Sequence, residues 1–104
     1  MTRLAIIGFG EVGQRLAQDL SSRPDLTIIV WDRLFTEPDS NPGQAADRLN
    51  VQKARTLSDA VQNATHVISA VTAAEAIPVA SEAGPLLSTG VWYLDVNSIS
   101  PSSR

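Results

Sequence analysis

The sequence of 104 residues contains no cysteine and a single histidine, His66. Without cysteine there can be no disulfide and no thiolate metal site, and one histidine leaves only carboxylates as ligands for a hard cation. Long apolar runs are missing as well, since the first, Leu4–Ile7, is far shorter than a signal-peptide core or a membrane span. We therefore expect no metal site, no membrane association and a cytoplasmic location.

Basic charge is scarce. Eight Lys and Arg residues stand against eleven Asp and Glu residues, which gives a formal net charge of -3 and a pI near 4.9. Such a chain offers no basic surface for the phosphates of a duplex, so nucleic acid is not expected as a partner. The length and a hydrophobic content of 43% predict one globular domain over residues 1–104.

Apolar runs and helical patterns alternate along the chain. Buried strands are predicted at residues 3–7, 26–31, 66–71 and 91–96, with a short edge strand at 51–55. The first run has apolar residues on both faces, and residues 26–31 are of the same kind, which is typical of parallel strands covered on both faces. We predict an α/β fold of Rossmann-like type: a doubly wound parallel sheet of about five strands in three α-β-α layers.

Helices are predicted between these strands. The first covers residues 11–22, where Val12, Leu16 and Leu20 recur every four residues and Gly13 and Ala17 give a small-residue edge. After an exposed loop at 33–43, short helices are expected from a cap at Asn41 to about residue 49 and from a cap at Ser58 to residue 63. In a last helix at 76–87, Pro78 would be tolerable only in the first turn, and Pro85 should end or kink the helix.

The first strand runs into the motif GFGEVG, which contains Gly8, Gly10 and Gly13. Three glycines alone usually mean a tight turn. Here the first closes a buried strand, the last lies in the first turn of an amphipathic helix, and Asp32 ends the next strand 19 residues after Gly13. This combination is typical of a dinucleotide-binding fingerprint, in which the acidic residue follows at about 20 residues.

Each glycine has a physical role in such a site. Gly8 would permit the tight turn, Gly10 would leave room for the pyrophosphate, and Gly13 would let the helix lie close to the strand. The amide groups and positive dipole end of the helix would then face the anion. Glu11 would lie near the pyrophosphate as an outward first-turn residue.

Asp32 and Arg33 bear on the choice of cofactor. A carboxylate at Asp32 can accept both hydroxyls of the adenosine ribose and repels a 2′-phosphate, which favours NAD. Arg33 could pair with a 2′-phosphate, stack on adenine or remain a solvated loop charge. The predicted cofactor is NAD or NADP, with NAD favoured.

Thr72 and Ala73 follow the third buried strand, at the sheet edge where open α/β sheets bind ligands. They could line a nicotinamide site or form an ordinary strand-to-helix turn. His66 begins that strand, and we interpret it as structural or solvent-facing.

The segment YLDVNSISPSS, residues 93–103, resembles the substrate-binding stretch of the β-hydroxyacid dehydrogenases, in particular the branch related to 6-phosphogluconate dehydrogenase. The opening IIGFGEVGQRLAQDL and the middle stretch VISAVTAAEAIPVASEAGPLL look like the same family. The resemblance therefore covers nearly the whole chain.

The resemblance implies specific site residues. Asp32 and Arg33 match the ribose-reading positions, while Val71 and Thr72 match the strand end beside the nicotinamide. Asn97 and Ser98 occupy the places of the family's serine and threonine, which hold the substrate, although they could also only cap a following helix. The loop that holds the pyrophosphate is matched by Gly8, Phe9, Gly10, Glu11, Val12 and Gly13.

The family's catalytic lysine has no counterpart here. It belongs to a later helical domain that also mediates dimerisation, whereas the only lysine of this chain, Lys53, lies near the predicted edge strand. Hydride transfer also needs a proton donor or acceptor at the substrate. We predict a cofactor-binding domain without a catalytic residue and with little or no turnover alone. The full-length protein would act on a small hydroxy acid, with a homodimer as a candidate assembly.

Two other classes stay open. A prephenate dehydrogenase has a similar opening, but Ser100 stands where such enzymes tend to carry a lysine. Nucleotide-sensing regulatory domains of potassium-transport systems also begin with a strand, GxGxxG, a helix and a strand ending in Asp, and they bind adenine nucleotides without reacting them.

Overall fold

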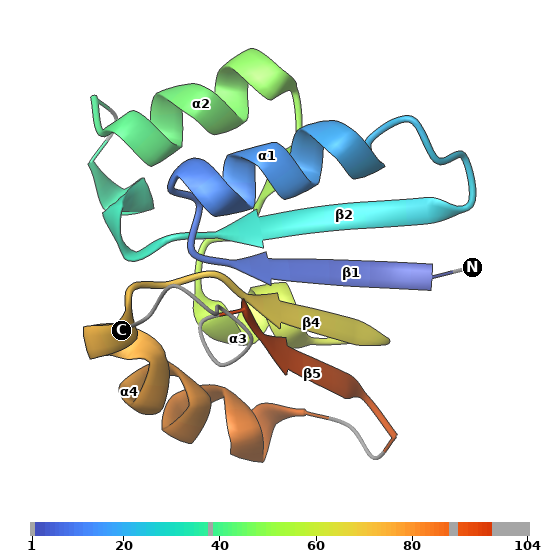
Figure 1. Ribbon diagram of the computed structural model, residues 1–104, viewed down its shortest axis with the longest axis vertical. Helices are drawn as coiled ribbons and strands as arrows, with labels where there is room; N and C mark the ends of the chain where they lie inside the picture. The colour runs from blue at the N-terminus through green and yellow to red at the C-terminus, as the bar shows by residue number, and fades with distance from the viewer. Residues whose placement is uncertain (1, 38, 88–89, 97–104) are drawn as a thin grey trace.

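A computed structural model describes residues 2–37, 39–87 and 90–96 of the chain. Within these residues, five parallel strands form one sheet in the order β3-β2-β1-β4-β5 (Figure 1). Central β1 pairs with β2 and β4, so that Ile7 lies opposite Trp31 on one side and Ser69 on the other. The predicted doubly wound α/β fold is confirmed. The strands are β1 (Thr2–Ile7), β2 (Leu26–Trp31), β3 (Gln52–Lys53), β4 (His66–Ser69) and β5 (Trp92–Asp95).

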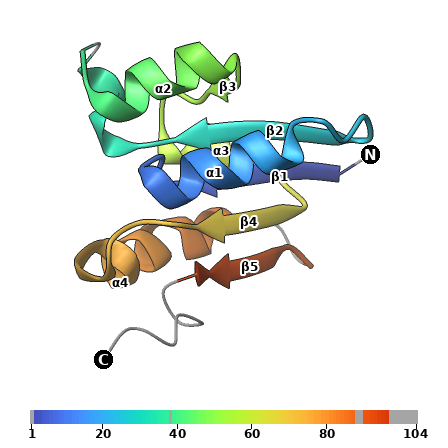
Figure 2. The same cartoon turned by 45° about the horizontal axis from the view of Figure 1, so that its top comes forward.

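Helices cover both faces of the sheet and make three layers. Helices α1 (Glu11–Leu20) and α2 (Asn41–Leu49) lie on one face, and α3 (Leu57–Val61) and α4 (Ala73–Ala83) lie on the other (Figures 1 and 2). Short 3₁₀ helices, η1 (Arg33–Thr36) and η2 (Gly84–Leu86), follow β2 and α4. In the described part of the chain, no helix is both long and apolar enough to cross a bilayer.

Alternate residues of β1 pack into two separate hydrophobic cores, one on each face of the sheet. Ile6 points toward α1 and α2, where it packs with Phe9 and Val30. Ala5 and Ile7 point to the other face and pack with the residues of α3 and α4. All five side chains are fully buried, which explains why β1 is apolar at every position from residue 4 to residue 7.

The apolar face of α1 differs from the predicted one. Gly13 and Ala17 are its buried residues, whereas the side chain of Val12 is 51% exposed. The helix turns its small residues inward because its first turn lies against the backbone of Gly8. The predicted stripe of Val12, Leu16 and Leu20 was therefore wrong at Val12.

Two predicted helix caps were also wrong. Helix α2 is capped by Ser40, whose Oγ accepts a hydrogen bond from the Gly43 amide at 3.2 Å, so Asn41 is the first helical residue. Helix α3 is capped by Thr56, whose Oγ1 accepts from the Asp59 amide at 3.0 Å. In both cases a hydroxyl just upstream of the predicted cap satisfies a free amide of the first turn.

Helix α4, which follows β4, begins earlier in the chain than predicted. Strand β4 ends at Ser69 rather than residue 71, and α4 begins at Ala73 rather than residue 76. Pro78 therefore lies inside the helix, beyond its first turn, contrary to the prediction. Pro85 falls in η2, directly after the end of α4, as expected.

One part of the sheet is uncovered among the described residues. Helices α1 and α2 lie over β1, β2 and β3, while the same face of β4 and β5 borders an open hollow of about 640 Å³. Trp92 is 73% exposed there, and Leu94 is exposed as well. Leu4, Leu26 and Ile68 complete the apolar lining. We call this surface the β4–β5 hollow.

Candidate functional site

A second pocket, of about 200 Å³, lies where β1, β2 and β4 end. This is the edge of a doubly wound sheet at which ligands bind, because chain crossovers diverge there to opposite faces. Its volume is below the roughly 300–1,000 Å³ of pockets that enclose drug-sized ligands, so a dinucleotide would extend beyond it. Its lining residues are Gly8, Gly10, Trp31, Asp32, Arg33, Leu34, Pro42, Ala70, Val71, Thr72 and Glu75.

Gly8 and Gly13 close the turn between β1 and α1. Gly8 has φ +92°, and a Cβ built there would lie 2.8 Å from Val71 Cγ1 and 2.9 Å from the Ala70 carbonyl carbon. A Cβ on Gly13 would overlap the carbonyl oxygen of Gly8. Both positions require glycine for the fold itself, in agreement with their predicted roles.

Gly10 differs from both of its neighbours in the motif. Its φ and ψ of -79° and -154° are extended, and nothing lies within 4 Å of a Cβ built there. Gly10 is also the N-cap of α1, where no side chain caps the free amides of the first turn. An anion at this position would meet those amides and the positive end of the helix dipole.

Asp32 is fixed by two backbone amides. Its Oδ2 accepts a hydrogen bond from the Phe9 amide at 2.7 Å, and its Oδ1 accepts from the Leu34 amide at 2.9 Å. A carboxylate offers about four acceptor positions, so each oxygen can still accept a hydroxyl of a ligand. The carboxylate therefore joins the glycine loop to η1 and is oriented in the pocket.

Arg33 forms an ion pair across the pocket. Its Nε lies 2.9 Å from Oε2 of Glu75, which belongs to the first turn of α4. The two side chains are 64% and 30% exposed. This contact joins the segment after β2 to the helix after β4.

The other predicted residues of the glycine loop lie off the pocket. The ring of Phe9 is fully buried and packs edge-to-face on Phe35, with centroids 6.3 Å apart. Glu11 and Val12 are exposed on the first turn of α1.

On the other side, Val71 and Thr72 line the pocket as predicted from the strand end. Thr72 is the N-cap of α4 and makes no side-chain cap hydrogen bond, and Ala73 is the first residue of that helix. Asn97 and Ser98, the predicted substrate-binding pair, lie outside the described residues.

Sequence reasoning missed several lining residues, namely Trp31, Leu34, Pro42, Ala70 and Glu75. Most of them are neighbours of predicted positions. Leu34 could have been predicted from the sequence, because an Asp side chain often accepts a hydrogen bond from the backbone amide two residues later, which here is that of Leu34. For Glu75 the sequence contains only a weak indication, namely an acidic residue near the start of a helix.

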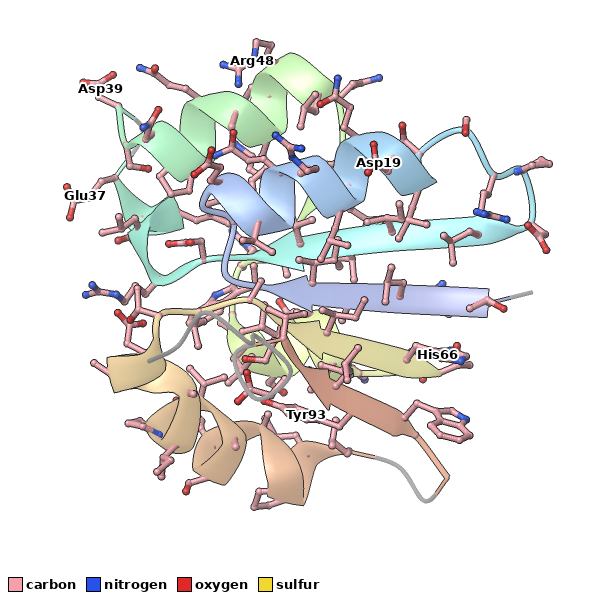
Figure 3. The ribbon with its side chains drawn as sticks, viewed as in Figure 1. Asp19, Glu37, Asp39, Arg48, His66 and Tyr93 are labelled. Atoms are coloured by element: carbon pink, nitrogen blue, oxygen red, sulfur yellow. The ribbon has the colours of Figure 1, made fainter. Side chains whose placement is uncertain are left out.

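Three further observations concern the histidine, the lysine and the acidic groups of the described residues. His66 lies at the opposite end of the sheet (Figure 3), where its Nδ1 is 2.9 Å from Thr65 Oγ1. Lys53 Nζ pairs with Asp47 Oδ1 at 2.8 Å on edge strand β3. Among the described residues, no group of three or more His, Asp or Glu side chains is placed to hold a metal ion.

A doubly wound sheet whose first strand ends in a glycine loop, with a carboxylate from the second strand fixed beside it, defines an NAD(P)-binding domain of the dehydrogenase type. The family model for the saccharopine dehydrogenase NADP-binding domain matches residues 4–104. The chain belongs to this family.

Individual relatives extend the comparison. The chain is 33% identical over 102 residues to an uncharacterized 28.5 kDa protein of Methanothermus fervidus, covering 98% of this chain and 38% of that protein. A conserved hypothetical protein of Sinorhizobium meliloti 1021 superposes with a TM-score of 0.81 at 31% identity, over 91% of this chain and 32% of that one.

The Mycobacterium tuberculosis 3-hydroxyisobutyrate dehydrogenase, solved with L-serine, superposes with a TM-score of 0.77 at 20% identity, over 91% of this chain and 31% of that one. At that identity the likeness shows the fold alone. The dehydrogenase-type dinucleotide fold expected from the resemblance is confirmed, whereas membership of the β-hydroxyacid branch remains a prediction. This chain spans 38% of its curated relative's length and about a third of these structures.

Proposed function

We propose that the chain binds NAD or NADP at this pocket, as the coenzyme domain of an oxidoreductase. The observation that carries the proposal is the carboxylate of Asp32, fixed by the amides of Phe9 and Leu34 beside the open position at Gly10. If the glycines served only to form a turn, there would be no reason for the space beside Gly10 to be empty. A dinucleotide needs that space for its pyrophosphate and needs the carboxylate for its ribose.

The binding roles follow from the geometry. The first-turn amides of α1, next to Gly10, would hold the pyrophosphate. The free acceptor positions of Asp32 would take the ribose hydroxyls, and Thr72 would lie on the path toward the nicotinamide at the end of β4. When bound, the coenzyme would supply or accept a hydride.

NAD is the preferred coenzyme in this proposal. A 2′-phosphate would lie against the carboxylate of Asp32, and the nearby cation, Arg33, is already paired with Glu75. The family is described by NADP binding, so the preference rests on these particular residues.

We further propose that the full-length protein transfers hydride to or from a small hydroxy acid in the cytoplasm. The support is the sequence after β5, in which Asn97 and Ser98 would hold the substrate. The proton donor or acceptor would come from residues outside this domain, since Lys53 is paired with Asp47 on the far edge of the sheet.

Calorimetric titration of the purified chain with NADH and with NADPH tests the coenzyme assignment. We expect saturable binding of NADH and weaker binding of NADPH. If neither coenzyme binds at millimolar concentration, the assignment is wrong, and a clear preference for NADPH would contradict the role given to Asp32.

A matched pair of variants sharpens the titration. Asp32→Asn keeps the shape of the side chain but removes one acceptor and the charge, so NADH affinity should fall about 10- to 100-fold, the equivalent of one hydrogen bond to a charged group. Asp19→Asn makes the same charge change on the exposed part of α1 and should leave affinity unchanged. Equal affinities of the two variants would contradict the proposal.

A further inference from the structure

The ion pair between Arg33 and Glu75 lies at the part of the pocket where the two coenzymes differ. NADP carries a phosphate on the 2′-hydroxyl of the adenosine ribose, which is the group that Asp32 would contact. Arg33 directly follows Asp32 in the chain, and Glu75 lines the same pocket from α4. The pair therefore borders the space that a 2′-phosphate would occupy.

The charges around that space do not favour a second anion. The carboxylate of Asp32 is held by two backbone amides, and that of Glu75 is paired with Arg33 at 2.9 Å. Two negative charges and one positive charge thus surround the ribose position. A guanidinium engaged by a carboxylate can serve a phosphate only by sharing or exchanging its partner.

We propose that Glu75 is a specificity-determining residue that selects NAD over NADP by holding Arg33. This inference rests on the proposed function of the pocket. Binding of NADP would draw the guanidinium to the 2′-phosphate and leave the carboxylate of Glu75 unpaired beside a like charge. Binding of NAD leaves the ion pair in place, so Glu75 disfavours only the phosphorylated coenzyme.

The exposure of the two side chains makes this exchange feasible. Arg33 is 64% exposed, so its guanidinium can move without opening the core, while Glu75 is 30% exposed and sits on a helix. An ion pair between solvent-accessible groups is worth at most about a kilocalorie per mole. The expected selectivity is correspondingly modest, about 3- to 5-fold in affinity.

The test is calorimetric titration of Glu75→Gln with NADH and NADPH at one fixed ionic strength. Glutamine keeps the length of the side chain but loses the charge that holds Arg33. We expect NADPH affinity to rise about 3- to 5-fold and NADH affinity to stay within about twofold of the wild type. Glu82→Gln removes the same charge from an exposed position farther along α4 and should change neither affinity.

A second background isolates the contribution of Arg33. In a chain carrying Arg33→Gln, the added Glu75→Gln substitution should raise NADPH affinity less than it does in the wild-type background, because it removes a like charge but has no guanidinium to release. The inference is overturned if Glu75→Gln leaves NADPH affinity unchanged or lowers it. It is also overturned if both coenzymes gain equally, or if the gain is undiminished without Arg33.

These outcomes are separable from failure of the proposed function. A wild-type chain that binds neither coenzyme overturns both statements. A wild-type chain that binds NADH, with no change of preference in Glu75→Gln, overturns only the role of Glu75.

Discussion

Gly10 and Gly13 lie three residues apart in one motif, yet the structure requires glycine at only one of them. A Cβ on Gly13 would overlap the backbone of Gly8, whereas a Cβ on Gly10 would meet nothing within 4 Å. The packing of α1 accounts for glycine at position 13, whereas at position 10 the proposed dinucleotide, passing close to the backbone, would account for it.

This difference predicts opposite effects for two substitutions. Gly10→Val should keep the free energy of unfolding within about 0.5 kcal/mol of the wild type and abolish NADH binding. Gly13→Ala should lower the free energy of unfolding by about 1–3 kcal/mol, because the added methyl group forces α1 away from the sheet. Urea unfolding and NADH titration of both variants provide the measurements. Wild-type affinity in Gly10→Val would show that the glycines form only a turn.

At the scale of the helices, the cap of α3 gives a direct comparison between two neighbouring hydroxyl residues. Thr56 accepts a hydrogen bond from the amide of Asp59, whereas Ser58 lies within the helix and is exposed. Thr56→Ala should lower the free energy of unfolding by about 1 kcal/mol, the usual loss for an N-cap. Ser58→Ala should change it by less than about 0.5 kcal/mol, as for other surface positions. A larger effect at Ser58 in chemical denaturation would argue against the observed start of α3.

The elements show what could be predicted from the sequence. Their apolar runs located β1, β2, β4 and β5 to within two residues, but the prediction that the last strand is buried was wrong on the face of β5 that carries Trp92 and Leu94. The starts of α2, α3 and α4 were misplaced, because several residues near each start are able to cap a helix and tertiary packing selects one of them. Likewise, the rotation of α1 depends on its contact with Gly8, which no periodicity of α1 reveals.

The same limit applies to the candidate site. Asp32 was predicted because its distance from the glycine loop follows from the length of one strand-helix-strand unit. Its two amide partners were not predicted, and neither was the pairing of Arg33 with Glu75. That pair joins segments far apart in the chain, and it depends on how α4 is placed against the end of β2.

At the scale of the whole molecule, the β4–β5 hollow is an apolar surface that no other part of the described chain covers. An apolar dye such as anilinonaphthalene sulfonate should bind there, because its fluorescence reports exposed hydrophobic surface. Trp92→Ser should reduce the dye fluorescence of the native protein. Ile77→Ser should not, since Ile77 is 78% exposed on α4 and lies outside the hollow. Unchanged dye fluorescence in Trp92→Ser would show that the hollow binds no apolar molecule.

The placement of this hollow has a topological consequence. Connections that run from β1 to β2 to β3 carry their helices on one face, and those that return from β3 to β4 to β5 carry theirs on the other, as right-handed crossovers require. A further parallel strand added beside β5 by the same kind of connection would place its helix with α3 and α4. Extending the sheet in that direction would thus leave Trp92 uncovered, and only a segment that arrives by a different route, or a separate molecule, can cover it.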